Sequence, residues 1–232
     1  MTKELKFYDP GFEEVVRCEL HIADRPITEE DALKAHTLDC LDFFFDPRDY
    51  DALSAFKNLT QLSISMNTNK LDFLREFPLL EELTLEMLSS DGYVDFMHFS
   101  CLPHLEELIV SGGDLSDIDY KNLEGLIDLK KLESLLLHEF GTVDLRPLRR
   151  MPWLKNLYCG YANAVYDIDA IASLPDLEAL TLVDVKMENL DFLDAFPDTL
   201  TLKLSWIQVK NGINYDKLSR FVAGDFNDIE DI

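Results

Sequence analysis

The sequence has few of the residues and segments that usually mark an enzyme, a redox protein or a membrane protein. It contains only 9 glycines and no glycine-rich loop of the kind that cradles phosphate. Its 4 cysteines show no CxxC pairing and no metal-ligand spacing, so we expect free thiols. No apolar run approaches the roughly 18 residues that a membrane helix needs. The N-terminus has no apolar signal-peptide core, which predicts a cytoplasmic protein without membrane insertion.

Basic residues are also scarce. The chain has 21 Lys and Arg against 45 Asp and Glu, which gives a formal net charge of −24. Nucleic acids and anionic membranes attract Lys and Arg and repel carboxylates, so this charge speaks against both as partners. It is compatible with a basic protein partner or a cation, and solubility alone is also a sufficient reason for it.

Residues that could do chemistry are present but form no recognisable site. The five histidines are scattered along the chain, and neither HExxH nor GxSxG occurs. We therefore predict no catalytic residues, no metal site and no cofactor. One alternative stays open, a metal-binding or hydrolytic protein that uses acidic residues on its strands. Its candidates are the calcium-like spacing of Asp114, Asp117 and Asp119 and the strand acids Glu82, Glu86 and Glu107.

Leucines recur along the chain with the spacing of leucine-rich repeats. In each unit apolar residues occupy positions 1, 4 and 6, as Leu154, Leu157 and Cys159 illustrate. The alternation from position 4 to position 6 is typical of a half-buried strand. Successive units are 21, 21, 25, 27, 22, 23 and 22 residues apart, within the range of about 20 to 29 for this architecture. They begin at Leu38, Leu59, Leu80, Leu105, Leu132, Leu154, Leu177 and, less regularly, Thr199.

A second apolar pattern stays in register when it is counted backwards from the next unit. Three apolar residues lie nine, six and three positions before each unit after the first, as in Leu145, Leu148 and Met151. This spacing suits a 3₁₀ helix or another short helix that returns the chain, and its regularity argues against a leucine-rich helical bundle. The longer third and fourth units are expected to add an α-helix, with Ser116 as its N-cap.

Stacked units of this kind share one core, because a single unit cannot bury its own leucines. The predicted fold class is therefore α/β, a leucine-rich repeat solenoid or horseshoe with a parallel sheet on its concave face.

The two ends of the chain differ from the repeats. Asp9-Pro10 predicts the start of one helix and Thr28 the start of a second, and together these would cover the open end of the core. Tyr215, Leu218 and Phe221 repeat the apolar triplet, with no strand expected after it, and residues 224–232 are interpreted as a frayed acidic tail. The predicted division is a helical N-terminal cap at 1–36, leucine-rich repeats at 37–209, and a C-terminal cap with its tail at 210–232.

The N-terminal segment resembles that of a known family. The run Phe7-x-Asp9-Pro10-x-Phe12, with Val16-Arg17, Ile27-Thr28 and Leu38-Asp39 after it, is similar to the helical cap of internalin-like bacterial leucine-rich repeat proteins. The resemblance continues through the repeats. It implies that the concave face binds another protein, as it does in that family.

Side chains at positions 3, 5 and 7 of each strand should point onto the concave face. Most are polar or small, but Ile109, Leu136 and Tyr158 share position 5 on three consecutive strands and should form one apolar strip. We therefore predict a non-catalytic protein-interaction module with Leu136 and Tyr158 as anchors. The other predicted binding residues are His138, Tyr161 and Glu107 at the border of the strip, and Glu82 and Glu86, which would favour a basic element of the partner. If the partner binds elsewhere, the insertions of the third and fourth repeats are the next candidates.

Overall fold

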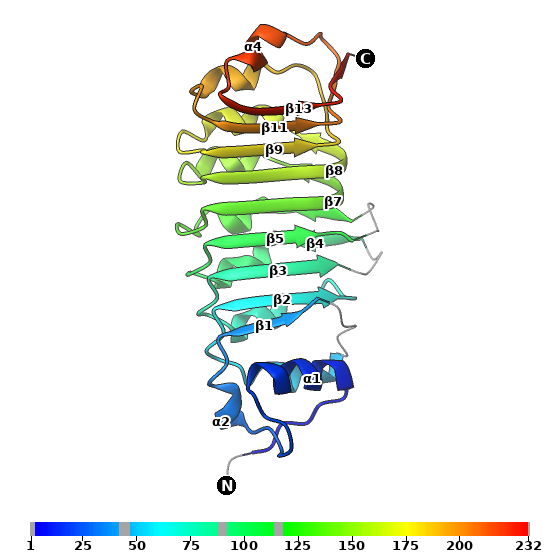
Figure 1. Ribbon diagram of the computed structural model, residues 1–232, viewed down its shortest axis with the longest axis vertical. Coiled ribbons are helices and arrows are strands. Elements are labelled where there is room, and N and C mark those ends of the chain that lie inside the picture. The colour runs from blue at the N-terminus through cyan, green and yellow to red at the C-terminus, as the bar shows by residue number, and fades with distance from the viewer. Residues whose placement is uncertain (1–2, 42–46, 88–91, 114–117, 232) are drawn as a thin grey trace.

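The chain folds into an elongated stack of coils with one long parallel sheet along its length (Figure 1). The computed structural model describes residues 3–41, 47–87, 92–113 and 118–231. Each coil contributes one strand, and neighbouring strands pair in parallel. This is the predicted leucine-rich repeat solenoid. The strands, in spatial order, are β1 (Thr37–Cys40), β2 (Gln61–Met66), β3 (Glu82–Met87), β5 (Glu107–Ser111), β7 (Ser134–Asp144), β8 (Asn156–Tyr166), β9 (Ala179–Val183), β11 (Thr201–Ser205) and β13 (Ala223–Asn227).

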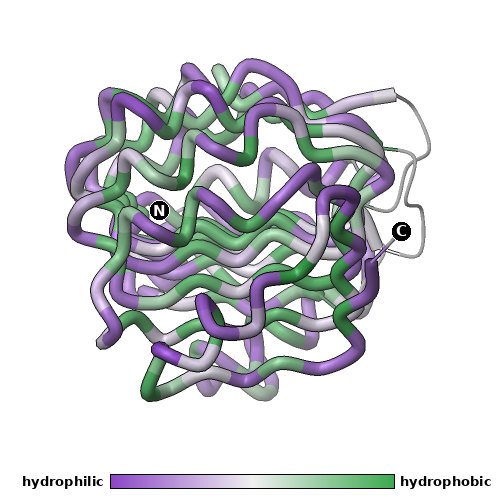
Figure 2. The backbone as a smooth tube through the Cα atoms, turned by 90° about the horizontal axis from the view of Figure 1, so that it is seen from above, coloured by the Kyte–Doolittle hydropathy of each residue, from purple (hydrophilic) through white to green (hydrophobic). Residues whose placement is uncertain are grey.

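The return half of each coil is short and mostly 3₁₀-helical, as the spacing of three predicts. All residues of the apolar triplets are buried except Tyr50 and Ile168, which are half-buried, and Tyr215, which is exposed. Seen along the stack, successive coils superpose around a shared interior (Figure 2). The return elements are η1 (Pro47–Asp49) with α3 (Tyr50–Leu53), η2 (Asp72–Glu76), η3 (Phe96–Cys101), η4 (Leu123–Leu126), η5 (Arg146–Arg150), η6 (Ile168–Ser173), η7 (Asp191–Ala195) and α4 (Tyr215–Ser219).

The third and fourth units do not carry the predicted α-helix in the residues that the structure describes, and Ser116 lies outside them. Their extra length instead provides β4 (Tyr93–Asp95) and β6 (Asp119–Lys121), which pair with each other. β6 also pairs with β7 through Tyr120 and Val143. The inserted backbone therefore finds hydrogen-bond partners in the next coil, which removes the need for a helix.

The N-terminal cap is confirmed. α1 (Pro10–Glu19) begins where the Asp9 side chain accepts hydrogen bonds from the backbone of Gly11, at 2.7 Å, and Phe12, at 3.2 Å. α2 (Glu29–Ala32) begins at a capping box between Thr28 and Asp31. Phe12 of α1 is fully buried, so the helix closes the end of the core beside β1.

The first repeat lies three residues earlier than predicted. Leu38 pairs with Leu62 and Cys40 with Ile64, so Leu38 occupies position 4 and Cys40 position 6. Cys40 is fully buried and is not on the strand face. Ala35 takes the buried position 1, where an alanine gives no leucine signal. The predicted later positions of this unit, Asp42 to Phe44, fall outside the described residues.

The C-terminal prediction of a frayed tail is wrong. A strand, β13, follows Phe221 and pairs with β11 over its whole length. A second small parallel sheet joins β10 (Lys186–Met187), β12 (Gln208–Val209) and β14 (Glu230–Asp231). The sequence did not predict β13, because the strand is polar. It buries little side-chain surface and pairs through its backbone. Among the described residues, no helix is long and apolar enough to cross a bilayer.

Candidate functional site

The predicted apolar strip exists as a continuous feature of the strand face. Ile109 of β5 pairs with Leu136 of β7, and Leu136 pairs with Tyr158 of β8. Each side chain is half-buried, while the apolar residues on either side of it in sequence are buried in the core. The same row is polar beyond the strip, with Thr84 on β3 and Thr181 on β9. The strip is therefore the apolar segment of an otherwise polar row.

Tyr158 remains a neutral phenol throughout the physiological range. Burial raises its pKa to about 12, and the nearby Tyr161, Cys159 and Glu139 add to this effect. A neutral phenol on a half-buried ring offers apolar area together with one hydroxyl that can donate or accept a hydrogen bond.

Aromatic rings extend the strip toward the end of the strands. The His138 ring lies 5.6 Å from that of Tyr158 and 5.0 Å from that of Tyr161. Tyr161 in turn contacts Trp206 edge to face, with ring centroids 6.0 Å apart. We call His138, Tyr158, Tyr161 and Trp206 the aromatic cluster. Trp206 is 51% exposed, and the sequence reasoning missed it because it follows its strand by one residue.

Backbone geometry explains how Tyr161 and Trp206 reach this place. Both occupy position 8 of their repeat, immediately after the last position of the strand face, and both have a left-handed backbone with φ of 56° and 55°. The corresponding residue is left-handed in five consecutive coils, and the turned backbone is tied to the next coil, for example from Trp206 N to Asn227 O at 3.0 Å. We call these residues the turn row: Glu139, Tyr161, Asp184, Trp206 and Asp228.

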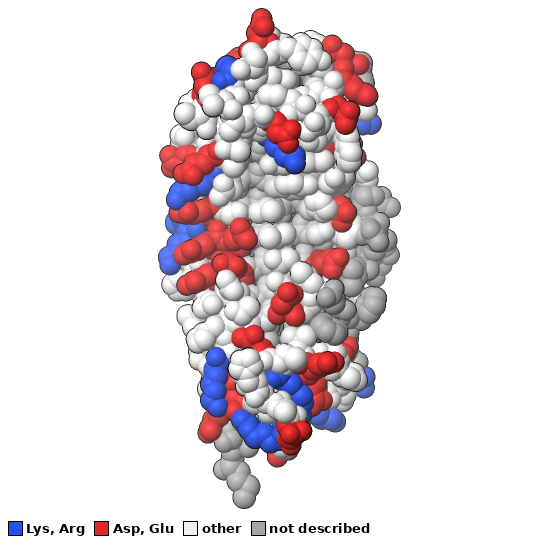
Figure 3. Space-filling view, in the orientation of Figure 1, with Lys and Arg blue, Asp and Glu red and all other residues white. Residues whose placement is uncertain are grey.

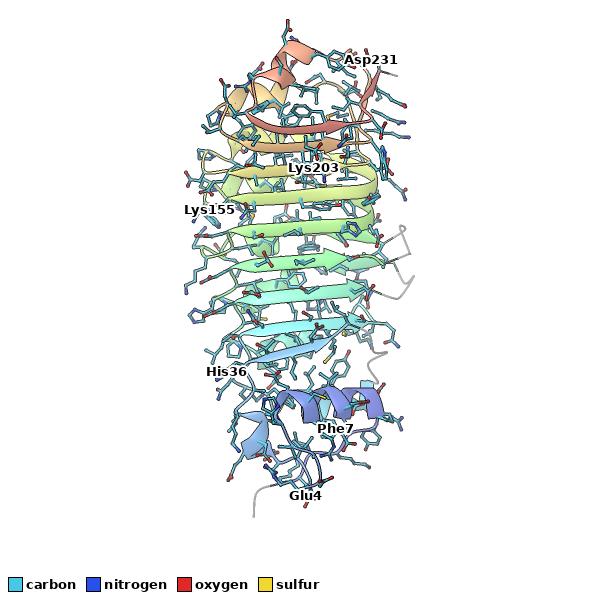
Figure 4. The ribbon with its side chains drawn as sticks, in the orientation of Figure 1. Glu4, Phe7, His36, Lys155, Lys203 and Asp231 are labelled. Atoms are coloured by element: carbon cyan, nitrogen blue, oxygen red, sulfur yellow. The ribbon has the colours of Figure 1, made fainter. Side chains whose placement is uncertain are left out.

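A shallow groove of about 350 Å³ lies between the aromatic cluster and the last strands. Tyr158, Tyr161, Trp206 and Asp228 are among the residues that line it. Lys203 of β11 also lines it, and its ammonium nitrogen lies 3.8 Å from a carboxylate oxygen of Asp225. Figure 4 labels Lys203 on the strand face, and the same view shows the groove's strands stacked one above another.

The predicted acidic residues lie on the two strands before the strip. Glu107 precedes Ile109 on β5 and pairs with Glu82 of β3. Glu86, at the other end of β3, accepts a hydrogen bond of 2.6 Å from the Ser65 hydroxyl. Acidic side chains gather along the margin where the strands begin, while the middle of the face is largely uncharged (Figure 3). The structure therefore brings Ile109, Leu136, Tyr158, His138 and Tyr161 into one patch, with Glu107 beside it and Glu82 and Glu86 one strand farther away.

The residues that were candidates for chemistry lie in ordinary structural surroundings. All four cysteines are free thiols, and burial raises the pKa of Cys40 and Cys159 to about 12. No group of three or more His, Cys, Asp or Glu side chains is placed to hold a metal ion within the described ranges. Asp119 accepts a hydrogen bond of 2.7 Å from Thr142, while Asp114 and Asp117 lie outside those ranges.

The comparison with solved structures supports the fold. Internalin C2 from Listeria monocytogenes is 18% identical, with a TM-score of 0.73 over 97% of this chain and 94% of that chain. The leucine-rich repeat ectodomain of the Arabidopsis receptor kinase HAESA, solved with an extended IDA peptide hormone, is 18% identical, with a TM-score of 0.56 over 77% of this chain and 32% of that chain. InlP of Listeria monocytogenes is 15% identical, with a TM-score of 0.52 over 88% of this chain and 65% of that chain.

These likenesses show that the chain has the leucine-rich repeat solenoid fold that internalins also have. No protein-family model matches the sequence, and no curated protein matches it.

Proposed function

We propose that this chain is a non-catalytic protein-interaction module whose partner binds the strand face across β5, β7 and β8. Leu136 and Tyr158 are its anchors, Ile109 extends the strip, and His138 and Tyr161 form its border. The observation that carries the proposal is the in-register apolar strip on a face where most other positions are polar or small. Large half-buried side chains within a polar rim have the composition of an interface centre.

The similarity to other solenoids supports the same function. The structure of HAESA holds a peptide hormone on a leucine-rich repeat domain. A wide sheet of parallel strands presents many side chains at regular intervals, which suits recognition of an extended or folded protein surface. The acidic residues Glu82, Glu86 and Glu107 favour a partner with a basic element beside the strip.

The test compares face variants with matched controls elsewhere on the molecule. A benzophenone amino acid placed at Thr84 would cross-link a partner from the source cell, and the purified partner would then be titrated. Tyr158→Ala and Leu136→Ser should each weaken its binding by at least about 1 kcal/mol. Tyr166→Ala, at the far end of β8, and Met97→Ser, on η3, change residues that are 58% and 50% exposed and should leave affinity unchanged.

The outcomes separate two binding surfaces. If both face variants bind as tightly as the parent chain, the proposed face is wrong. If Met97→Ser alone weakens binding, the partner uses the return side of the third repeat.

A further inference from the structure

We infer that the turn row and the groove beside it bind a cationic side chain of the protein partner, arginine in preference to lysine. This inference deepens the proposed function and rests on it for the identity of the partner as a protein. Its test uses small probes, so the two can fail separately.

The first observation is the order of side chains in the turn row. Acidic and aromatic residues alternate along five consecutive coils, as Glu139, Tyr161, Asp184, Trp206 and Asp228. Neighbouring coils lie about 4.8 Å apart at the backbone, so Tyr161 and Trp206 each have an acidic residue of the turn row in the coil before and in the coil after. Ring faces attract cations through their quadrupole and carboxylates attract them through their charge. The alternation therefore offers both kinds of attraction at one place.

The second observation is that the rings are held in position before any ligand arrives. The Trp206 indole nitrogen donates a hydrogen bond of 2.9 Å to Asp228, and the ring contacts Tyr161 edge to face. Trp206 nevertheless stays 51% exposed. A ring that is already fixed loses little conformational freedom on binding, so a larger part of the contact energy contributes to affinity.

The third observation is the local charge. Asp184 occupies the turn-row position in the coil between those of Tyr161 and Trp206, is exposed, and its carboxylate has no hydrogen-bond or ion-pair partner among the described residues. Lys203 is the basic residue of the groove, and Asp225 lies 3.8 Å from it. Asp228 lines the groove with Lys203, and the turn row contributes two further carboxylates, Glu139 and Asp184, outside the groove lining. Together with Asp225, the groove and the turn row therefore have four carboxylates against one ammonium group. The excess of negative charge favours a cationic occupant.

Arginine fits this surface better than lysine. Its planar guanidinium can stack on an aromatic face while its edge donates two hydrogen bonds to a carboxylate. Lysine presents a point charge that is more strongly hydrated, so it loses more solvation on entering the groove.

The experiment follows the tryptophan indole signals by nitrogen-15 NMR. The chain has 2 tryptophans. Trp153 serves as an internal reference, because its indole nitrogen donates to Leu129 O at 3.1 Å and the Lys130 ammonium already lies over its ring. N-acetyl-arginine amide would be titrated against its neutral analogue, N-acetyl-citrulline amide. We expect a saturable shift of the Trp206 signal with arginine only, at millimolar concentration, and weaker binding as salt is raised.

Matched variants locate the site. Asp184→Asn should weaken arginine binding by up to about fivefold, as expected for one exposed charge. Asp176→Asn changes an exposed acid that precedes β9, at the opposite end of the same strand, and should have no effect. Leu136→Ser should leave arginine binding intact while it weakens binding of the partner, which distinguishes this inference from the proposed function.

Three results would overturn the inference. Equal responses to arginine and citrulline would show that charge is not recognised. The absence of any saturable shift at Trp206 would show that the groove is not a side-chain site. A shift caused by cellohexaose and by neither amino-acid probe would assign the aromatic rings to carbohydrate binding.

Discussion

Gly125 is the position where the close stacking of two coils can be tested most directly. It lies in η4, which packs on η3 of the preceding coil. A Cβ atom added there would lie 2.1 Å from the carbonyl oxygen of Phe96 and 2.7 Å from the Cα of Met97. Both are backbone atoms, so no side-chain rotation can relieve the overlap. Gly125→Ala must therefore push the two coils apart or distort one of them.

The size of the effect follows from that distance. Restoring an ordinary contact of 3.4 Å requires a shift of about 1.3 Å. A gap of that size removes roughly half of the dispersion energy between the surfaces that it separates. We expect Gly125→Ala to destabilise the protein by about 3 kcal/mol, the upper end for overpacking, or about 6 to 12 °C in Tm for a chain of this length.

Equilibrium unfolding in denaturant measures this change, and Glu124→Ala is the matched control. Glu124 is the exposed neighbour of Gly125 on the same short helix, so its replacement should change the free energy of unfolding by less than about 0.5 kcal/mol. A loss below about 1 kcal/mol for Gly125→Ala would show that the two coils can separate at little cost, contrary to the reasoning above.

Three further predictions concern the core, the cap and the alternative function. Leu135 is fully buried between Leu108 and Leu157 on neighbouring strands, so Leu135→Ala should cost about 2 to 5 kcal/mol, and a loss under about 0.5 kcal/mol in denaturant would contradict the register. Hydrogen bonds from Arg25, then Lys34 and Thr28, hold the pKa of Asp31 well below its ordinary value of 3.8. This carboxylate therefore stabilises the fold above pH 3.8, and the stabilisation is lost as the pH falls below that value. Asp31→Asn should flatten the acid side of the plot of unfolding free energy against pH, and an unchanged acid side would count against this role. Calcium or zinc should not raise Tm in a thermal-shift titration, whereas a saturable rise of several degrees would favour the metal-binding alternative.

The sequence was sufficient to predict the solenoid, because burial decides most of its positions. Position 4 of every coil from β2 to β11 is a buried leucine, so the register there follows from one residue type. The errors lie where another force replaces burial. β13 is held by backbone pairing with β11 and has a polar sequence, and the buried position 1 of the first coil is Ala35, which gives no leucine signal.

The candidate site was predictable only in part, for a related reason. Ile109, Leu136 and Tyr158 follow the two-residue alternation of a strand, so their common row could be deduced. Trp206 and Asp184 follow their strands, where a left-handed residue ends the alternation. A spacing of 22 or 23 residues links the members of the turn row, but its residue types vary, and hydrophobicity alone gives no signal there.

The strain in the turn row gives a last prediction that joins stability to binding. Left-handed geometry costs an L-residue about 1 to 2 kcal/mol, and glycine adopts it freely. Asp184 has φ of 50°, and its backbone N–H donates to Ser205 O at 2.9 Å, a bond that glycine would keep. Its exposed side chain has no partner in the described residues, so no side-chain contact offsets this cost. We expect Asp184→Gly to stabilise the protein by up to about 1 kcal/mol and no more, since glycine also adds freedom to the unfolded chain.

The same variant should weaken arginine binding at Trp206, because the carboxylate is lost. Denaturant unfolding and the indole titration on one sample measure both effects. A gain in unfolding free energy together with a loss of arginine affinity would mean that the strained residue serves binding. A loss of unfolding free energy would mean that the aspartate supports the fold instead.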